Sequence, residues 1–85
     1  MAIVFIPPKL RQLTGAAQVE VVGGTVRAAV DELELKHPGV RDRLIEDGEL
    51  SPLLQLSVDH MMTRLLSTKI DSSTEIHFLP VIGGG

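Results

Sequence analysis

The sequence predicts an α+β fold in which a mixed sheet of four to five strands packs on one main helix. Two observations lead to this prediction. Strand-like segments open and close the chain, and a single amphipathic helical segment separates one pair of strands from the next. Because a helix must bury its apolar stripe, and the sheet offers the apolar surface for it, we expect the helix to cover one face of the sheet.

The first two strands are expected at residues 3–6 and 18–22. The first segment is a β-rich apolar run that ends at Pro7 and Pro8, which remove two ladder donors and force a turn or loop. The second alternates polar and apolar residues with period two and is closed by Gly23–Gly24. We interpret these glycines as a tight turn, since a phosphate-binding loop would need a fuller glycine pattern. The two strands are predicted to form a hairpin.

The main helix has the clearest signature in the chain. Thr25 occupies an N-cap position. The apolar residues after it follow one helical stripe, formed by Val26, Ala29, Val30 and Leu33. Pro38–Gly39 is expected to end the helix. A solvated polar face explains the acidic residues Asp31, Glu32 and Glu34 without general acid or base catalysis.

The chain after the helix is predicted to return to the sheet. Residues 41–46 form a short helical turn, 47–49 a loop, and 53–58 a third strand. A brief edge strand is expected at 64–66. Met61–Met62 is expected to pack in the core beneath an irregular loop, which is a common use of methionine.

The last strand is predicted at residues 74–79. Its alternation places Ile76 and Phe78 on one face, and Pro80 ends the ladder. The crossover through the helix lets the first and last strands lie side by side in the centre of the sheet. This order of elements is the one expected for a β-grasp, or ubiquitin-like, roll.

Composition excludes several classes of function. The net charge is −3 and the eight Lys and Arg residues are scattered, which argues against nucleic acid as a partner. Cysteine is absent, so a thiolate zinc site and a thiol nucleophile are excluded. Apolar runs are too short to span a bilayer, and the start of the chain lacks a signal-peptide pattern, so a cytoplasmic protein without a membrane partner is expected.

Side chains that could perform chemistry are also few. The three histidines, His37, His60 and His77, have no spacing that gathers metal ligands, so no metal site is expected. No serine has a plausible histidine and acid arrangement. The carboxylate of Gly85 is therefore the chemically distinctive group, and we do not expect an enzyme.

The last three residues of the sequence are all glycine and are predicted to form a short tail. We expect a folded domain at residues 1–82 and a flexible glycine tail at 83–85. Glycine carries no side chain, so such a tail fits a narrow slot, and the segment from Pro80 to Gly85 reaches roughly 17 Å when extended. A frayed terminus without function is the alternative interpretation.

Three segments resemble the ubiquitin-like sulfur-carrier family of the ThiS/MoaD type. They are Ile6–Gly15 after the first strand, Gly24–Val26 at the start of the helix, and Phe78–Gly85 at the end. The first of these, together with Arg41–Leu44, is most similar to carriers used in cysteine biosynthesis and to molybdopterin-type relatives.

The resemblance implies a carrier cycle. An activating enzyme of the E1 type would use ATP and Mg²⁺ to adenylate Gly85, beside Gly84, while the carrier itself binds no cofactor. A sulfur donor would then produce a thiocarboxylate for a client synthase or sulfurtransferase, of which the chain could be the small subunit. Partner contacts are expected at Gly83, Pro80, Leu79 and His77. Two alternatives stay open: a protein modifier conjugated through Gly85, and a β-grasp binding module that is not conjugated.

Overall fold

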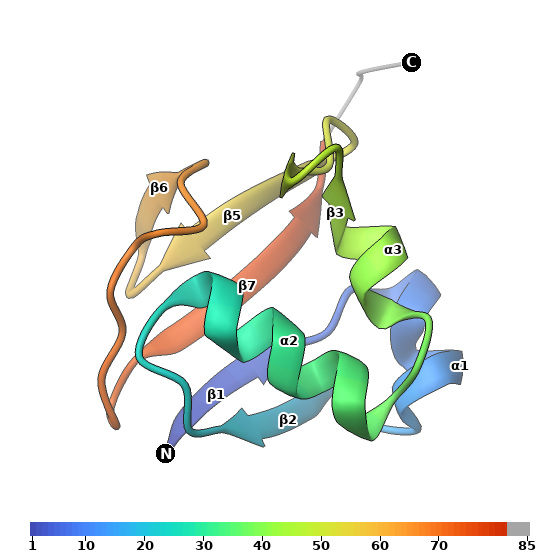
Figure 1. The fold of residues 1–85 in the computed structure, drawn as a ribbon, viewed down its shortest axis with the longest axis horizontal. Coiled ribbons are helices and arrows are strands. Elements are labelled where there is room, and N and C mark those ends of the chain that lie inside the picture. Colours follow the sequence, from blue (N-terminus) through green and yellow to red (C-terminus); the bar gives the residue numbers. More distant parts are fainter. Residues whose placement is uncertain (82–85) are drawn as a thin grey trace.

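The computed structural model describes residues 1–81, so Ile82 and the predicted glycine tail, Gly83–Gly85, lie outside its described part. A five-stranded mixed sheet, in the order β2-β1-β7-β5-β6, packs one face against helix α2 (Figure 1). This arrangement confirms the predicted β-grasp roll. In chain order the elements are β1 (Ala2–Phe5), η1 (Pro8–Leu10), α1 (Arg11–Thr14), β2 (Gln18–Val21), α2 (Val26–Lys36), α3 (Val40–Leu44), β3 (Ile45–Glu46), β4 (Glu49–Leu50), β5 (Leu54–Val58), β6 (Met61–Thr63) and β7 (Glu75–Pro80).

Strands β1 and β7 occupy the centre of the sheet. They run parallel, with Val4 opposite Ile76, and their other neighbours are antiparallel. The first and last strands therefore lie side by side, as the sequence predicted. Because β1 and β7 are parallel, their carboxyl ends meet at the same edge of the sheet, and the chain leaves β7 there.

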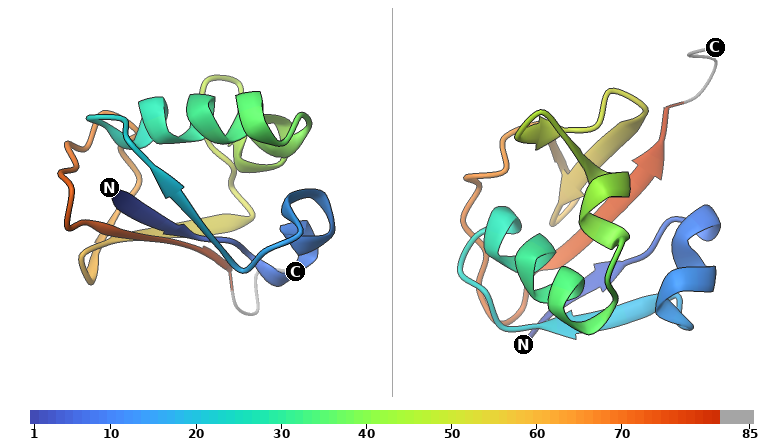
Figure 2. Two further views of the ribbon diagram at one scale, coloured as in Figure 1. Left: turned by 90° about the horizontal axis from the view of Figure 1, so that it is seen from below. Right: turned by 45° about the vertical axis from the view of Figure 1, so that its right-hand side comes forward.

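Strands β1 and β2 are antiparallel neighbours, which confirms the predicted pairing. Their connection is more structured than the simple turn or loop expected at the two prolines. It forms the 3-10 helix η1 and the one-turn helix α1, which closes at Gly15 with a φ of 69° (Figure 2). A side chain at Gly15 would be strained because this φ lies in the left-handed region.

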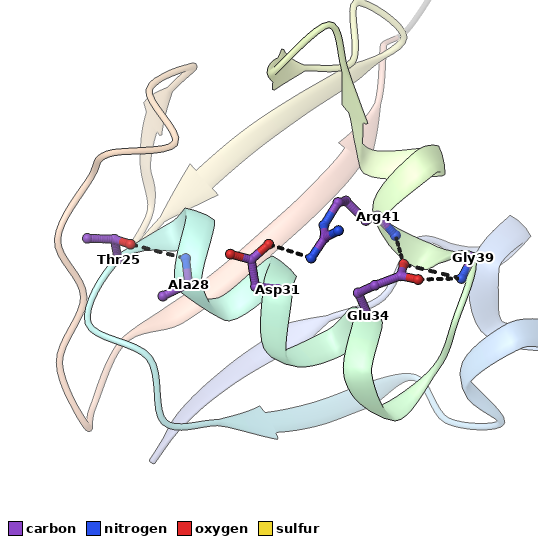
Figure 3. A network of polar contacts seen from close by, with 6 residues as sticks. All are labelled: Thr25, Ala28, Asp31, Glu34, Gly39 and Arg41. Carbon is purple, nitrogen blue, oxygen red and sulfur yellow. Dashed lines mark hydrogen bonds and ion pairs between the residues drawn. The ribbon is translucent and has the colours of Figure 1, made fainter.

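Helix α2 forms as the sequence predicted. The hydroxyl of Thr25 accepts a hydrogen bond from the backbone N–H of Ala28 at 3.1 Å, which satisfies one of the unpaired donors of the first turn (Figure 3). The four residues of the predicted stripe are all buried against the sheet. Gly39, with a φ of 103°, then turns the chain into α3.

The segment after α2 differs from the prediction. The helical turn spans Val40–Leu44, and Ile45–Glu46 is a strand that pairs with Glu49–Leu50. The expected loop at 47–49 is thus a β-hairpin. Asp47 and Gly48 both have positive φ, at 54° and 79°, which matches the Asp-Gly turn typical of tight hairpins.

The predicted edge strand at 64–66 was wrong, because β6 lies at Met61–Thr63. Asp59 and His60 adopt φ values of 49° and 70° and reverse the chain within two residues, so pairing with β5 begins at Met61. The prediction that the methionines pack in the core was wrong as well. Met61 is 74% exposed and Met62 is 59% exposed on this edge strand.

The core lies between α2 and the sheet and is almost wholly aliphatic. Its largest buried side chains include Phe78, Ile6, Leu33, Leu44 and Leu56. Burial of these apolar groups is the main stabilising contribution to a domain of this size. Within residues 1–81, no helix has the length and apolar character of a membrane span.

Candidate functional site

The outer face of the sheet, opposite α2, is the first part of the candidate site. On β7 the inward residues Ile76 and Phe78 are buried, while His77 is half-buried and Leu79 is 41% exposed. The predicted alternation is confirmed. The face that carries His77 and Leu79 is not covered by any described element (Figure 2).

An aromatic pair occupies the centre of this outer face. His77 lies opposite Phe5 of β1 on one side and opposite Ser57 of β5 on the other. The rings of Phe5 and His77 stack with their centroids 4.1 Å apart and their planes 5° from parallel. Met62 lies opposite Ser57, so an exposed methionine continues the same row on β6. The row places two aromatic rings and a methionine on one face, and such side chains are common in protein interfaces.

Phe5 and Met62 were missing from the sequence-predicted site. The signal for Phe5 was available, since it is out of phase with the buried residues Val4 and Ile6 and therefore had to face outward. Met62 could not be placed because its strand was predicted at the wrong residues.

A carboxylate accompanies the aromatic pair. Nε2 of His77 lies 3.7 Å from Oε1 of Glu75, two residues earlier on the same face of β7. The backbone N–H of Glu75 in turn donates to Oδ1 of Asp59 at 2.9 Å. This end of the outer face carries carboxylates, whereas Leu79, toward the other end, has the neutral residue Gln55 opposite it on β5.

The second part of the candidate site is the tail root, which we define as Pro80 and Val81. Pro80 is the last residue of β7 and pairs with Leu54. The backbone N–H of Val81 donates to the carbonyl of Leu53 at 3.0 Å. This bond continues the pairing with the β5 side of the sheet one residue beyond Pro80, where the sequence predicted that the ladder ends.

Arg64 supports the tail root and was not predicted. Its guanidinium donates to the carbonyls of Leu54 at 2.9 Å, Ser51 at 3.1 Å and Leu50 at 3.3 Å. These carbonyls flank the turn that provides the acceptor for Val81. Because five rigid donors suit several acceptors at once, an arginine can hold such a turn. In the sequence, Arg64 is simply the first residue of a predicted edge strand, and nothing in its neighbourhood indicates that it holds this turn.

The structure places some of the predicted site residues and leaves others outside its described part. The structure places His77 and Leu79 together on the outer face and Pro80 at the tail root. Gly83, Gly84 and Gly85 lie outside the described residues, so their expected roles stay predictions.

The acidic residues of α2 serve the fold. The carboxylate of Glu34 accepts hydrogen bonds from the backbone N–H groups of Arg41 and Gly39, and these bonds lower its pKa from the ordinary value (Figure 3). Asp31 pairs with the guanidinium of Arg41 at 2.8 Å. Glu32 accepts from the N–H groups at the end of β2. These contacts tie the helix to its neighbours and explain the acidic face without catalysis.

A further lowered pKa belongs to Asp71, which accepts hydrogen bonds from the backbone N–H and hydroxyl of Ser73 in the turn before β7. This too is a turn-forming contact. In the part of the chain from residue 1 to 81, no three His, Asp or Glu side chains gather as metal ligands.

Comparison with known proteins identifies a matching protein family. The model of the ThiS family matches residues 4–85 of the chain. The fold also superposes with a TM-score of 0.91 on a chain of the BexX/CysO complex from Amycolatopsis orientalis, at 28% identity over 100% of both chains. No curated protein sequence gives a significant match.

Two further solved structures are similar. CysO from Mycobacterium tuberculosis superposes with a TM-score of 0.91 at 28% identity, over 96% of this chain and 100% of that one. The small archaeal modifier protein SAMP1 from Haloferax volcanii superposes with a TM-score of 0.75 at 25% identity, over 99% of this chain and 98% of that one.

Proposed function

The chain belongs to the ThiS family of ubiquitin-like sulfur carriers, and from this premise we propose that the carboxylate of Gly85 is the group that carries sulfur. The observation that supports the proposal most is that the family match continues through Gly85. The tail root agrees with it, because the bond from Val81 to Leu53 holds the residue before the last four at the edge of the folded body. The protein then acts as a co-substrate of other enzymes.

The chemistry begins with activation of the carboxylate. A carboxylate is a poor electrophile because its charge repels nucleophiles and its oxide is a poor leaving group. In the proposed cycle an oxygen of Gly85 attacks the α-phosphorus of ATP on an E1-like enzyme that uses Mg²⁺, and pyrophosphate leaves. Hydrosulfide from a sulfur donor then attacks the carbonyl carbon of the acyl-adenylate, AMP leaves, and the S–H proton is released. The product is a thiocarboxylate at the end of the chain.

The narrow tail suits delivery of this sulfur. A client enzyme can admit a chain of glycines into a closed pocket while it excludes water, which protects the thiocarboxylate and positions it for attack. The client is a synthase or sulfurtransferase, for which this chain would act as the small subunit. The similarity to two CysO chains, together with the resemblance of Ile6–Gly15 to cysteine-biosynthesis carriers, favours cysteine over molybdopterin or thiamine as the product.

The folded body provides recognition in this proposal. The outer face around Phe5, His77 and Leu79 is the surface that docks the activating enzyme, since it carries a stacked aromatic pair and an exposed leucine and includes the strand that leads to the tail. Gly83 and Pro80 connect this surface to the reactive end.

Intact mass spectrometry tests the proposal. The full chain is incubated with its activating enzyme, ATP, Mg²⁺ and a sulfide source. The expected product is heavier by the difference between one sulfur and one oxygen atom, and the increase requires ATP. The control is a second carrier that the same activating enzyme is known to thiolate. If that carrier gains mass and this chain does not, the carrier function is contradicted.

A second candidate function is protein modification through Gly85. It is favoured by the similarity to SAMP1, which is named a modifier protein. In this case an amine, and not sulfide, attacks the adenylate, and an isopeptide bond to a lysine results. Slower-migrating conjugates that disappear when residues 83–85 are removed would support it, while a non-conjugated binding module would give neither conjugates nor a thiocarboxylate.

A further inference from the structure

A groove of about 380 Å³ lies beside the tail root, apart from the outer face. The segment after β1, helix α3 and the turn before β5 enclose it together with Pro80. Six of its nine lining residues are leucine or proline, so it offers an apolar surface. Leu10 and Leu54 are its buried leucines, whereas Leu53 is 68% exposed.

Two cations line this apolar groove. Lys9 comes from η1 and Arg43 from α3, and the described residues that line the groove include no carboxylate. Neither cation has an ion pair or a side-chain hydrogen bond within residues 1–81, whereas Arg41 pairs with Asp31 and Arg64 donates to three carbonyls. The groove is thus positive in a chain whose net charge is −3.

This combination indicates the chemistry of an occupant. An apolar side chain fits between the leucines and prolines, and a carboxylate next to it would pair with Lys9 and Arg43. We propose that the groove is a second docking site, which binds a segment of a partner protein where a large apolar residue adjoins Asp or Glu. The proposal rests on the proposed function in one respect: the partner is the enzyme that receives the tail, because Pro80 and Leu53 line the groove and also form the tail root's contacts.

The chain's own end is the other possible occupant. Its residues 82–85 also combine an isoleucine with a carboxylate. Ordering four residues, three of them glycine, costs more backbone entropy than burial of one isoleucine side chain recovers. A segment already held in a folded partner avoids most of this cost, which favours the partner.

Peptide binding to the isotope-labelled full chain tests the proposal by NMR. The probe is the cyclic peptide cyclo(Gly-Leu-Glu-Gly-Pro), whose ring restricts Leu and Glu as a folded partner would, with two matched controls in which Lys replaces Glu or Ser replaces Leu. We expect the probe to shift the amide signals of Lys9, Leu10 and Leu54 and to bind more tightly than either control. Equal binding of the Lys peptide, or shifts confined to the outer face around His77, would overturn the proposal.

Charge variants complete the test. Arg43→Gln and Lys9→Gln should each weaken probe binding by about two- to fivefold, as expected for an exposed ion pair. Lys69→Gln is the matched control, because it makes the same charge change outside the groove and should leave binding unchanged. Equal effects of all three variants would overturn the proposal.

Two outcomes separate the remaining possibilities. If Ile82→Ser shifts the signals of Lys9 and Leu10 in the absence of peptide, the chain's own tail occupies the groove and the partner is excluded. The assay uses no ATP or sulfide, so failure of the groove proposal leaves thiocarboxylate formation to be decided separately by intact mass.

Discussion

The imidazole of His77 stacks on the ring of Phe5, with centroids 4.1 Å apart and planes 5° from parallel. The two residues are direct neighbours on the central parallel strands β7 and β1. His77 lies on β7, the strand that leads to the tail, and Phe5 lies beside it on β1. A partner that holds the tail can therefore contact this pair at the same time.

Replacement of His77 by Ala should weaken recognition by the activating enzyme. Aromatic anchors at interfaces often contribute 1 to 2 kcal/mol, so we expect kcat/KM for pyrophosphate release to fall by about 5- to 30-fold. The free energy of unfolding should fall by about 0.5 to 1.5 kcal/mol from loss of the stack.

The matched control is His37→Ala, since His37 is also half-buried but lies at the end of α2, away from the outer face. It should keep the wild-type kcat/KM. Equal kinetics for the two variants would show that the outer face does not dock this enzyme.

Leu33→Ala tests the core under the helix. Leu33 is fully buried, and truncation of such a side chain costs about 2 to 5 kcal/mol. Leu35→Ala, on the same helix but 84% exposed, should cost less than about 0.5 kcal/mol. Urea unfolding of both variants measures the difference, and similar costs would contradict the assigned helix face.

The sequence predicted the central elements well for a physical reason. Helix α2 and strand β7 each bury one face, and the spacing of apolar residues in the sequence indicates which face of an element is buried. The β3-β4 hairpin was missed because its strands have two residues each, too few for a period, although its Asp47-Gly48 turn was a usable signal.

Other features could not be predicted from local patterns. The turn at Asp59-His60 has positive φ at two residues that are not glycine, so the start of β6 was invisible in the sequence. Arg64 donates to carbonyls that lie 10 to 14 residues earlier in the chain, and no local sequence pattern shows such a contact. The pairing of Phe5 with His77 depends on the register of strands at opposite ends of the chain.

Gly23 and Gly24 should respond differently to alanine. A β-carbon on Gly23 would lie 2.8 Å from the β-carbon of Ala28, which is too close, so Gly23→Ala should cost about 1 to 3 kcal/mol from overpacking. A β-carbon on Gly24 would meet no heavy atom within 4 Å. Gly24→Ala should therefore be tolerated, and thermal unfolding of the two variants measures the contrast. A destabilised Gly24→Ala with an unaffected Gly23→Ala would contradict this packing.

Stability in acid should depend on Glu34. The N–H groups of Arg41 and Gly39 lower its pKa below the ordinary value of 4.5, which applies in the unfolded chain. The stabilisation from its ionised form is therefore present above pH 4.5 and is lost as the pH falls through the lower folded-state pKa. Glu34→Gln should show a smaller decline of the free energy of unfolding in this window.

Urea unfolding at a series of pH values measures this decline. Glu20→Gln is the control, because Glu20 is exposed and its side chain forms no hydrogen bond or ion pair within residues 1–81. It should decline like the wild type. An unchanged decline in Glu34→Gln would show that its contacts to the N–H groups do not persist in solution.

Activation should require the absence of a side chain near the end of the chain. A β-carbon at Gly84 would press on the walls of a slot shaped for bare backbone and would restrict access to positive φ. Gly84→Ala should therefore abolish or greatly slow pyrophosphate release with the activating enzyme. One residue added after Gly85 should be as damaging, because it moves the carboxylate by about 3.3 to 3.6 Å, farther than attack on ATP tolerates.

Gly24→Ala is the matched control for this last prediction, since it adds the same methyl group at a position with open space in the folded body. It should be activated at the wild-type rate. The circular dichroism of all three variants should match that of the wild type, because a β-carbon at Gly24 meets open space and the other two changes leave residues 1–81 unaltered. If Gly84→Ala and the extended chain are both activated normally, the glycine tail is not the reactive end, and a binding module that uses only the outer face becomes the better description.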